Sequence, residues 1–201
     1  MFKQLILVPF LWIGLFQNQQ HLEVLHENVA SLPNMNNGVQ KNRGFSINLY
    51  RISKAEKLGE VEDLESQIAK KIDTKVDLYK ITGDLAVIFL NTTNPYRNTT
   101  TIPYQMLYGR RVQKTVSVGE IGGFLPSSAI PAITQWIKTN KIETFAGFSK
   151  MYDNLSPAVK NELKEMGADD KVSLFNSYVR PLVVLYFTAL ENENSIVFIG
   201  Q

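Results

Sequence analysis

The apolar positions divide the chain into a short apolar start and a longer body of mixed patterns. Residues 5–16 are almost wholly apolar, and no charged residue follows Lys3 until Glu23. Over Gln19–Leu32, apolar residues recur at spacings of three and four, which predicts a short helix. We therefore expect three parts: an N-terminal membrane anchor or signal segment over 1–20, a linker helix over 21–38, and a globular domain over 39–201.

The first half of the body has one clear helical pattern between strand patterns. Apolar and polar residues alternate over Phe45–Ile52, which predicts a strand. Glu60–Ile72 places its apolar residues on one stripe, which predicts a helix packed against a core. Val76–Thr82 and Leu85–Leu90 are then expected to be two strands joined by a tight turn at Gly83-Asp84.

The second half alternates polar connections with apolar segments. Residues 91–113 are predicted to be a long polar loop, followed by a strand over Lys114–Val118. The glycines of Gly119–Phe124 allow a sharp turn or a close approach of the backbone to another group. Ser127-Ser128 is expected to cap a helix over Ala129–Thr139.

The end of the chain is predicted to be a helix followed by three apolar segments. Ser156, Pro157 and Gly167 mark the start and the end of the helix. The segments are Val172–Val179, Leu182–Leu190 and Ser195–Ile199, and the last two are expected to form a hairpin. The predicted fold class is α+β, with a central, mostly antiparallel sheet, flanking helices and a preceding N-terminal hydrophobic helix.

Composition and charge narrow the functional classes. The chain is 44% hydrophobic and 20% charged, which is ordinary for a folded domain. Its net charge is +2, and its longest basic clusters are the pairs Lys70-Lys71 and Arg110-Arg111, so a nucleic-acid partner is not expected. The absence of cysteine excludes disulfides and zinc sites built on sulfur.

The residues of common catalytic and metal sites do not form a recognisable pattern. His21 and His26 are five residues apart, so on a helix they point in different directions and cannot hold one metal ion together. Residues 39–201 contain no histidine for a Ser-His-Asp triad. Gly119–Gly123 lacks the Lys-Ser/Thr of a phosphate loop. We expect no metal, cofactor or enzymatic activity, with an enzyme lacking a readable motif as the alternative.

Two groups of polar and aromatic residues are candidates for binding. The first is Tyr104, Tyr108, Arg110 and Arg111, because aromatic and guanidinium groups in a long loop are typical of recognition surfaces. The second comprises Asn176, Tyr178 and Arg180. The alternative for each group is a structural role, with the loop folded back on its own sheet.

The apolar start leaves three interpretations open. Lys3 followed by the apolar run favours an uncleaved signal-anchor, which would place the body of the protein outside the inner membrane, in the periplasm. A cleaved signal peptide would make the protein secreted. In the third interpretation, residues 5–16 are a buried strand or helix of the fold.

Three features together resemble GAF and PAS-type domains: the helix over 60–72, the segment Asp73–Leu85 and the closing hairpin over Val172–Ile199. With the apolar start, the layout is also similar to that of the T-type holins of T-even phages. These resemblances imply a membrane-tethered domain that acts through a protein partner or as a homo-oligomer, with a role in phage lysis or its regulation. The alternative is a small-ligand sensor, in which the sheet and the 91–113 loop enclose a pocket.

Overall fold

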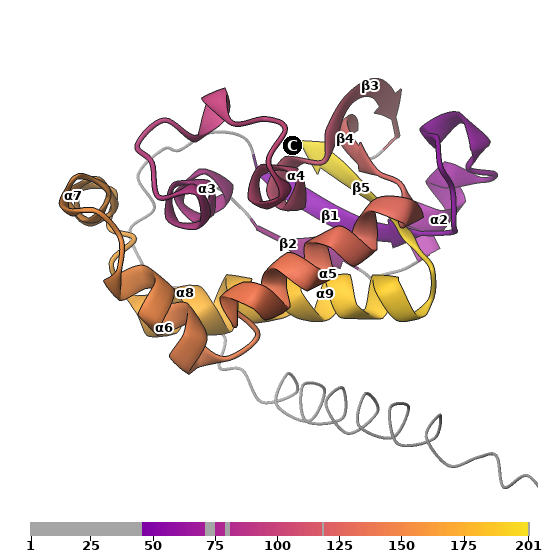
Figure 1. Cartoon of the computed structure of the whole chain (residues 1–201). Helices are drawn as coiled ribbons and strands as arrows, with labels where there is room; N and C mark the ends of the chain where they lie inside the picture. The colour runs from indigo at the N-terminus through magenta and orange to yellow at the C-terminus, as the bar shows by residue number, and fades with distance from the viewer. Residues whose placement is uncertain (1–45, 71–74, 79–80, 118, 201) are drawn as a thin grey trace, which may run out of the picture. The chain divides into compact units, whose positions relative to one another are not determined.

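The computed structural model describes residues 46–70, 75–78, 81–117 and 119–200 of the 201-residue chain. Within these residues, the strands form one sheet in which every neighbouring pair is antiparallel (Figure 1). The strands are β1 (Ile47–Ile52), β2 (Lys75–Asp77), β3 (Arg110–Val116), β4 (Gly119–Leu125) and β5 (Ser195–Gly200), in the order β2-β1-β5-β4-β3. The predicted α+β class with a central antiparallel sheet is thus confirmed.

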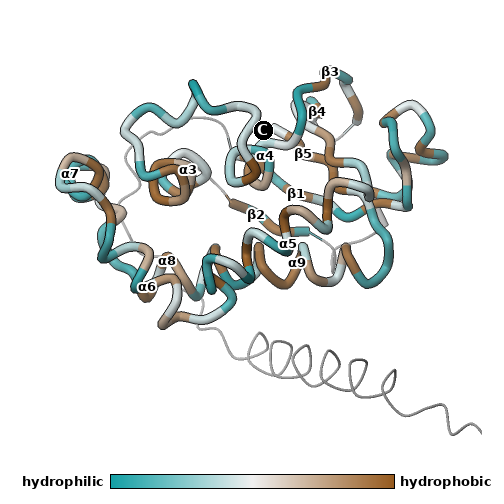
Figure 2. Tube along the Cα trace, viewed as in Figure 1, coloured by the Kyte–Doolittle hydropathy of each residue, from teal (hydrophilic) through white to brown (hydrophobic). Residues whose placement is uncertain are grey.

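The central strand β5 is buried on both of its faces. Ile196 and Phe198 belong to one hydrophobic cluster, whereas Val197 and Ile199 belong to another. Because successive side chains of a strand point to opposite faces, this division places one cluster on each side of the sheet. Figure 2 shows hydrophobic residues along β5 and along the helices α5 and α9.

Most of the helices share the first cluster, with Leu49, Ile196 and Phe198 of the sheet. They are α3 (Thr82–Leu90), α4 (Ile102–Tyr108), α5 (Ile130–Asn140), α6 (Phe145–Asp153), α7 (Pro157–Glu165), α8 (Lys171–Leu174) and α9 (Arg180–Glu191). The helices α5 and α9 lie side by side (Figure 1). On the opposite face, α2 (Leu64–Lys70) follows the 3-10 turn η1 (Leu58–Glu60) and packs Leu64 and Ile68 against Tyr50 and Ile52.

The predicted hairpin over residues 76–90 is wrong. β2 ends at Asp77, and Gly83 and Asp84 lie in the first turn of α3. α3 is buried on nearly all sides, so its sequence is apolar almost throughout and lacks the stripe that reveals a surface helix. A short run of this kind does not distinguish a buried helix from a buried strand.

The predicted long loop over 91–113 contains regular structure. It includes the 3-10 turn η4 (Pro95–Arg97), then α4, and β3 begins already at Arg110. Pro103 lies in the first turn of α4, where a missing N–H costs little. The expected strand at Lys114–Val118 is therefore the second half of a longer edge strand, and Val118 lies outside the described residues.

The glycines predicted to allow a close approach do so, but within a strand instead of a turn. Gly123 lies in β4, and a Cβ atom at this position would overlap the carbonyl oxygen of Tyr108 at the end of α4. Gly109, with φ of +68°, joins α4 directly to β3, and a Cβ there would lie 2.7 Å from the ring of Phe198. The C-terminal turn of α4 therefore lies directly against the sheet.

The predicted closing hairpin is also wrong, although its last strand is present as β5. Helical backbone runs from Lys171 to Glu191, through α8, the π-helical segment η6 (Phe175–Val179) and α9. Pro181 cannot donate a backbone hydrogen bond and its ring crowds the preceding turn. The wider π turn lies immediately before it, with the Arg180 N–H donating to the carbonyl of Phe175.

The helices α5 and α7 were predicted correctly. α7 begins with Ser156, whose hydroxyl accepts from the Val159 N–H, and Gly167 follows its end with φ of +65°. α5 is present, but Ser127 and Ser128 do not cap it. They form the 3-10 turn η5 (Ser127–Ala129), and the Ser127 hydroxyl donates instead to the carboxylate of Glu56 at 3.0 Å.

The contact between Gly123 and Tyr108 makes a sharp test of the position of α4. We expect Gly123→Ala to lower the free energy of unfolding by about 1–3 kcal/mol, because the added methyl group forces α4 away from the sheet. Gly122→Ala is the matched control: a Cβ at Gly122 meets nothing within 4 Å, so a change below about 0.5 kcal/mol is expected. Urea denaturation followed by circular dichroism measures both, and equal stability of the two variants would contradict the contact.

Candidate ligand-binding pocket

A pocket of about 880 Å³ lies where α4 meets the end of the sheet. Its volume is within the range of sites that enclose small molecules. The sheet contributes residues from all of its strands except β2, and the other side is made by α4 with the residues just before it. The lining comprises Ile47, Thr99, Thr100, Tyr104, Gln105, Tyr108, Gly109, Arg110, Arg111, Val112, Gln113, Glu120, Gly122, Gly123, Phe198 and Gly200.

The sheet register brings together lining residues that are far apart in the sequence. Ile47 of β1 pairs with Gly200 of β5, and Gly200 pairs in turn with Glu120 of β4. On the edge strand, the register between β3 and β4 shifts between Arg111 and Lys114. Such a bulge redirects the local side chains, and the residues within it, Val112 and Gln113, line the pocket.

The first predicted group of binding residues is brought together in this pocket. Tyr104 and Tyr108 come from α4, and Arg110 and Arg111 are the first two residues of β3. Gly109 alone separates the helix from the strand, so the sharp connection places the two tyrosines next to the two arginines. Both tyrosines are half-buried, whereas both arginines are exposed.

Three tyrosines form an aromatic cluster beside the pocket: Tyr96, Tyr104 and Tyr108. The rings of Tyr104 and Tyr108 are stacked with centroids 4.6 Å apart, and the Tyr96 ring lies 6.1 Å from that of Tyr108. Aromatic pairs at these distances contribute about 0.5–1.5 kcal/mol beyond the area that they bury. The cluster therefore fixes the orientation of the two rings that line the pocket.

The environment keeps the phenols of Tyr104 and Tyr108 protonated. Burial raises the pKa of Tyr108 above its usual value, and interactions with Tyr96, Tyr104 and Asp84 raise it further. Burial also raises the pKa of Tyr104, although the positive charge of Arg111 acts in the opposite direction. At neutral pH both phenols retain their proton and can donate a hydrogen bond.

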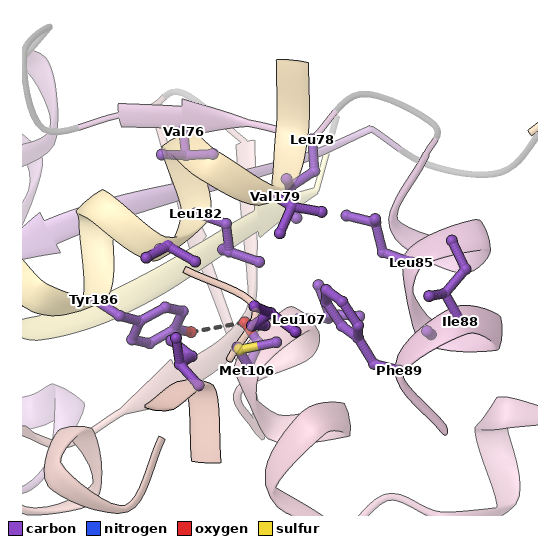
Figure 3. Close-up of a cluster of buried hydrophobic side chains, with 14 of the residues drawn as sticks. Val76, Leu78, Leu85, Ile88, Phe89, Met106, Leu107, Val179, Leu182 and Tyr186 are labelled. Atoms are coloured by element: carbon purple, nitrogen blue, oxygen red, sulfur yellow. Dashed lines mark hydrogen bonds between the residues drawn. The ribbon is translucent and has the colours of Figure 1, made fainter. Parts of the chain in front are cut away.

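A buried hydrogen bond attaches α4 to α9. The Tyr186 hydroxyl donates to the carbonyl oxygen of Met106 at 2.6 Å, as Figure 3 shows within the hydrophobic core. The last carbonyl groups of a helix lack partners within it, so Tyr186 satisfies one of them in a place that water does not reach. This hydrogen bond attaches α4 to the hydrophobic core on the side of the helix that faces away from the pocket.

The charged groups of the pocket are unpaired within the described residues. Among those residues, no acid lies within ion-pair distance of Arg110 or Arg111, and no lysine or arginine lies within that distance of Glu120. The two guanidinium groups therefore keep their donors available to a ligand.

The second predicted group lies elsewhere. Asn176 and Tyr178 are in the π-helical segment η6, and Arg180 is the first residue of α9. None of the three lines the pocket, and Tyr178 packs partly against the hydrophobic core. A role in binding for this group stays a prediction.

Sequence reasoning missed the part of the pocket that comes from the sheet. Glu120, Gly122 and Gly200 were not candidates, although the glycine-rich stretch over 119–123 was expected to permit a close approach. The pairing of Glu120 with Gly200 joins positions 80 residues apart, and no local pattern predicts it.

The described part of the chain holds no group of three or more acidic, histidine or cysteine side chains placed to bind a metal ion. It likewise has no helix with the length and apolar character needed to cross a membrane. The predicted anchor at residues 1–20, the linker helix over 21–38 and both histidines lie outside the described residues.

No protein-family model, curated protein or solved structure gives a significant match to the chain. Function is therefore inferred from the fold and from the chemistry of the pocket.

Removing the Tyr186 hydroxyl tests how α4 is held. We expect Tyr186→Phe to lower the free energy of unfolding at pH 7 by about 1–3 kcal/mol, because the buried Met106 carbonyl loses its partner. Burial raises the pKa of Tyr186 well above 10.0, so the folded state keeps a proton that the unfolded state releases. The stability that depends on this proton is complete below about pH 10 and is lost as the pH rises further.

The variant should therefore lose less stability than the wild type between pH 9 and pH 11. Urea titrations at both pH values measure the difference. If the two proteins showed the same stability and the same alkaline loss, the Tyr186–Met106 bond would not hold α4.

Proposed function

We propose that the domain is a non-enzymatic binding module, of the small-ligand sensor type, and that its site is the pocket between α4, β3 and the end of the sheet. The observation that carries this proposal is the convergence of Tyr104, Tyr108, Arg110 and Arg111 on one pocket of about 880 Å³. Pockets that bind small molecules combine apolar and aromatic walls with a few placed polar groups. The antiparallel sheet with flanking helices is compatible with the GAF/PAS-like layout, which we retain as a proposal.

A binding role fits the chemistry of the lining better than catalysis. The described lining residues include no histidine or cysteine, and Glu120 is the one carboxylate among them. General acid–base catalysis needs a group whose pKa is near the working pH, and protonated phenols and guanidinium groups do not meet this need at neutral pH. They are well suited to hold a ligand by hydrogen bonds, charge and stacking.

Filling the pocket tests this function without changing its charge. Gly122 lines the pocket and a Cβ atom there meets nothing within 4 Å, so Gly122→Leu should fill space that a ligand needs while leaving the fold intact. Gly59→Leu is the matched control, since Gly59 also has open space around it and lies in η1, away from the pocket.

We expect compounds from a metabolite library of acids, bases and neutral molecules to stabilise the full-length chain in thermal-shift assays. With Gly122→Leu, the ligand concentration needed for the same stabilisation should rise about tenfold or more, which corresponds to a loss of about 1.4 kcal/mol of binding free energy. Gly59→Leu should leave that concentration unchanged. A library in which no compound stabilises the wild type, or an effect that Gly122→Leu leaves unchanged, would contradict the proposal.

A second candidate function rests on the apolar run over residues 5–16. We propose that this segment tethers the domain to the inner membrane and that the domain acts on a protein partner or a second copy, in the manner implied by the T-type holins. The run with Lys3 before it supports membrane insertion.

Fractionation of cells that express the full chain tests the tether. The protein is expected in the membrane fraction, with its body digested by protease added to spheroplasts. Recovery of the full-length chain from the cytosol would contradict the tether and would leave the binding pocket unaffected.

A further inference from the structure

The pocket is lined by two positively charged residues at one end and by one negatively charged residue at the other. Arg110 and Arg111 pair with Phe124 and Gly123 across the β3–β4 ladder, whereas Glu120 lies three residues further along β4 from Gly123. At about 3.3 Å per residue, the backbone positions at the two ends are roughly 10 Å apart. Since charges are screened in about 8 Å at physiological ionic strength, Glu120 leaves the positive charge at the arginine end largely uncompensated.

The donors are concentrated at the arginine end. Arg111 is close enough to Tyr104 for its charge to influence the phenol, and Tyr108 stacks on Tyr104 at 4.6 Å. Guanidinium groups bind carboxylates and phosphates through paired N–H donors, and the protonated phenol of Tyr104 adds a further donor. Thr99, Thr100 and Gln105 add polar side chains to the lining from α4 and the residues before it.

The rest of the lining suits a flat, weakly polar body. Ile47, Val112 and Phe198 supply apolar surface, and Gly122 and Gly200 leave space above the strands. A ligand with an acidic group at one end and an unsaturated or aromatic body would match both parts of the pocket. A second acidic group at the far end would meet the like charge of Glu120.

We propose, building on the binding function above, that the pocket takes a small organic anion whose single acidic group lies against Arg111, with Arg110 adding positive charge at the same end of the pocket. In this arrangement Glu120 determines specificity, because it disfavours a second negative charge at the opposite end. The acidic group is a carboxylate or a phosphate monoester, which share the chemistry that a guanidinium group recognises.

Isothermal titration of the full-length chain with matched probes tests this ligand class. The probes are benzoate, phenyl phosphate, the neutral benzamide and the dianion terephthalate. Benzoate or phenyl phosphate should bind at least about tenfold more tightly than benzamide, as expected for hydrogen bonds to a charged group. Their relative affinity distinguishes a carboxylate from a phosphate ligand.

Substitutions test whether Arg111 causes the preference for an anion and whether Glu120 disfavours a dianion. Arg111→Gln should abolish the preference for the anion over benzamide, and Arg111→Lys should restore part of it. Lys114→Gln is the control, because Lys114 is an exposed cation of the same strand that does not line the pocket. Glu120→Gln should improve the binding of terephthalate severalfold relative to benzoate, whereas Glu165→Gln, an exposed acid on α7, should not.

The outcomes separate this inference from the function on which it rests. If benzamide bound as tightly as benzoate, or if Arg111→Gln left the preference unchanged, the anion assignment would be wrong while the pocket remained a binding site. If Glu120→Gln did not favour the dianion, the specificity assigned to Glu120 would be overturned. If no probe bound and the metabolite library also gave no stabilisation, both the ligand class and the binding function would be contradicted.

Discussion

The direct contact between the end of α4 and the sheet is the constraint on which the candidate site depends. At Gly123 the strand β4 has no side chain, so the carbonyl of Tyr108 can lie against its backbone. At Gly109 the positive φ of +68° lets the chain leave the helix and enter β3 without an intervening loop. A larger residue at either position would separate α4 from the sheet, and the walls of the pocket would no longer meet.

This packing contact also determines which polar side chains line the pocket. A connection of one residue places the tyrosines of the helix beside the arginines of the strand, and the stack of Tyr104 on Tyr108 limits the freedom of their rings. Behind them, the hydroxyl of Tyr186 satisfies a carbonyl group of α4 inside the core. The pocket is therefore formed by groups whose backbone is fixed before a ligand arrives, which lowers the entropic cost of binding.

The sequence predicted α5 and α7, which have one polar and one apolar face, whereas α6, which also has two such faces, was not predicted. α5 and α7 lie at the surface of the domain, so their periodic patterns and the signals around α7 gave their positions. α3 and α9 were mistaken for strands because both are covered on most sides, and a fully buried helix has no polar stripe. In β4, the glycines that were expected to allow a sharp turn or a close approach serve the approach of α4 within a strand.

The candidate site was predictable to the extent that its residues are close in sequence. Tyr104, Tyr108, Arg110 and Arg111 were recognised as a group from their chemistry, although the helix and strand that carry them were taken for a loop. Glu120, Gly200 and Ile47 join the pocket through the register of β1, β5 and β4, which depends on contacts across the whole domain. Local propensity contains no information on such pairings.

The most direct measurement of the central claim is the location of ligand-induced changes in the amide NMR spectrum of the full-length chain. A compound that stabilises the protein should shift the signals of residues 99–105, 109–113 and 120–123, and the signals of α7 and of the segment η6 should stay in place. Changes centred on Asn176–Arg180, or spread evenly over the domain, would contradict the assignment of the α4–β3 pocket as the binding site.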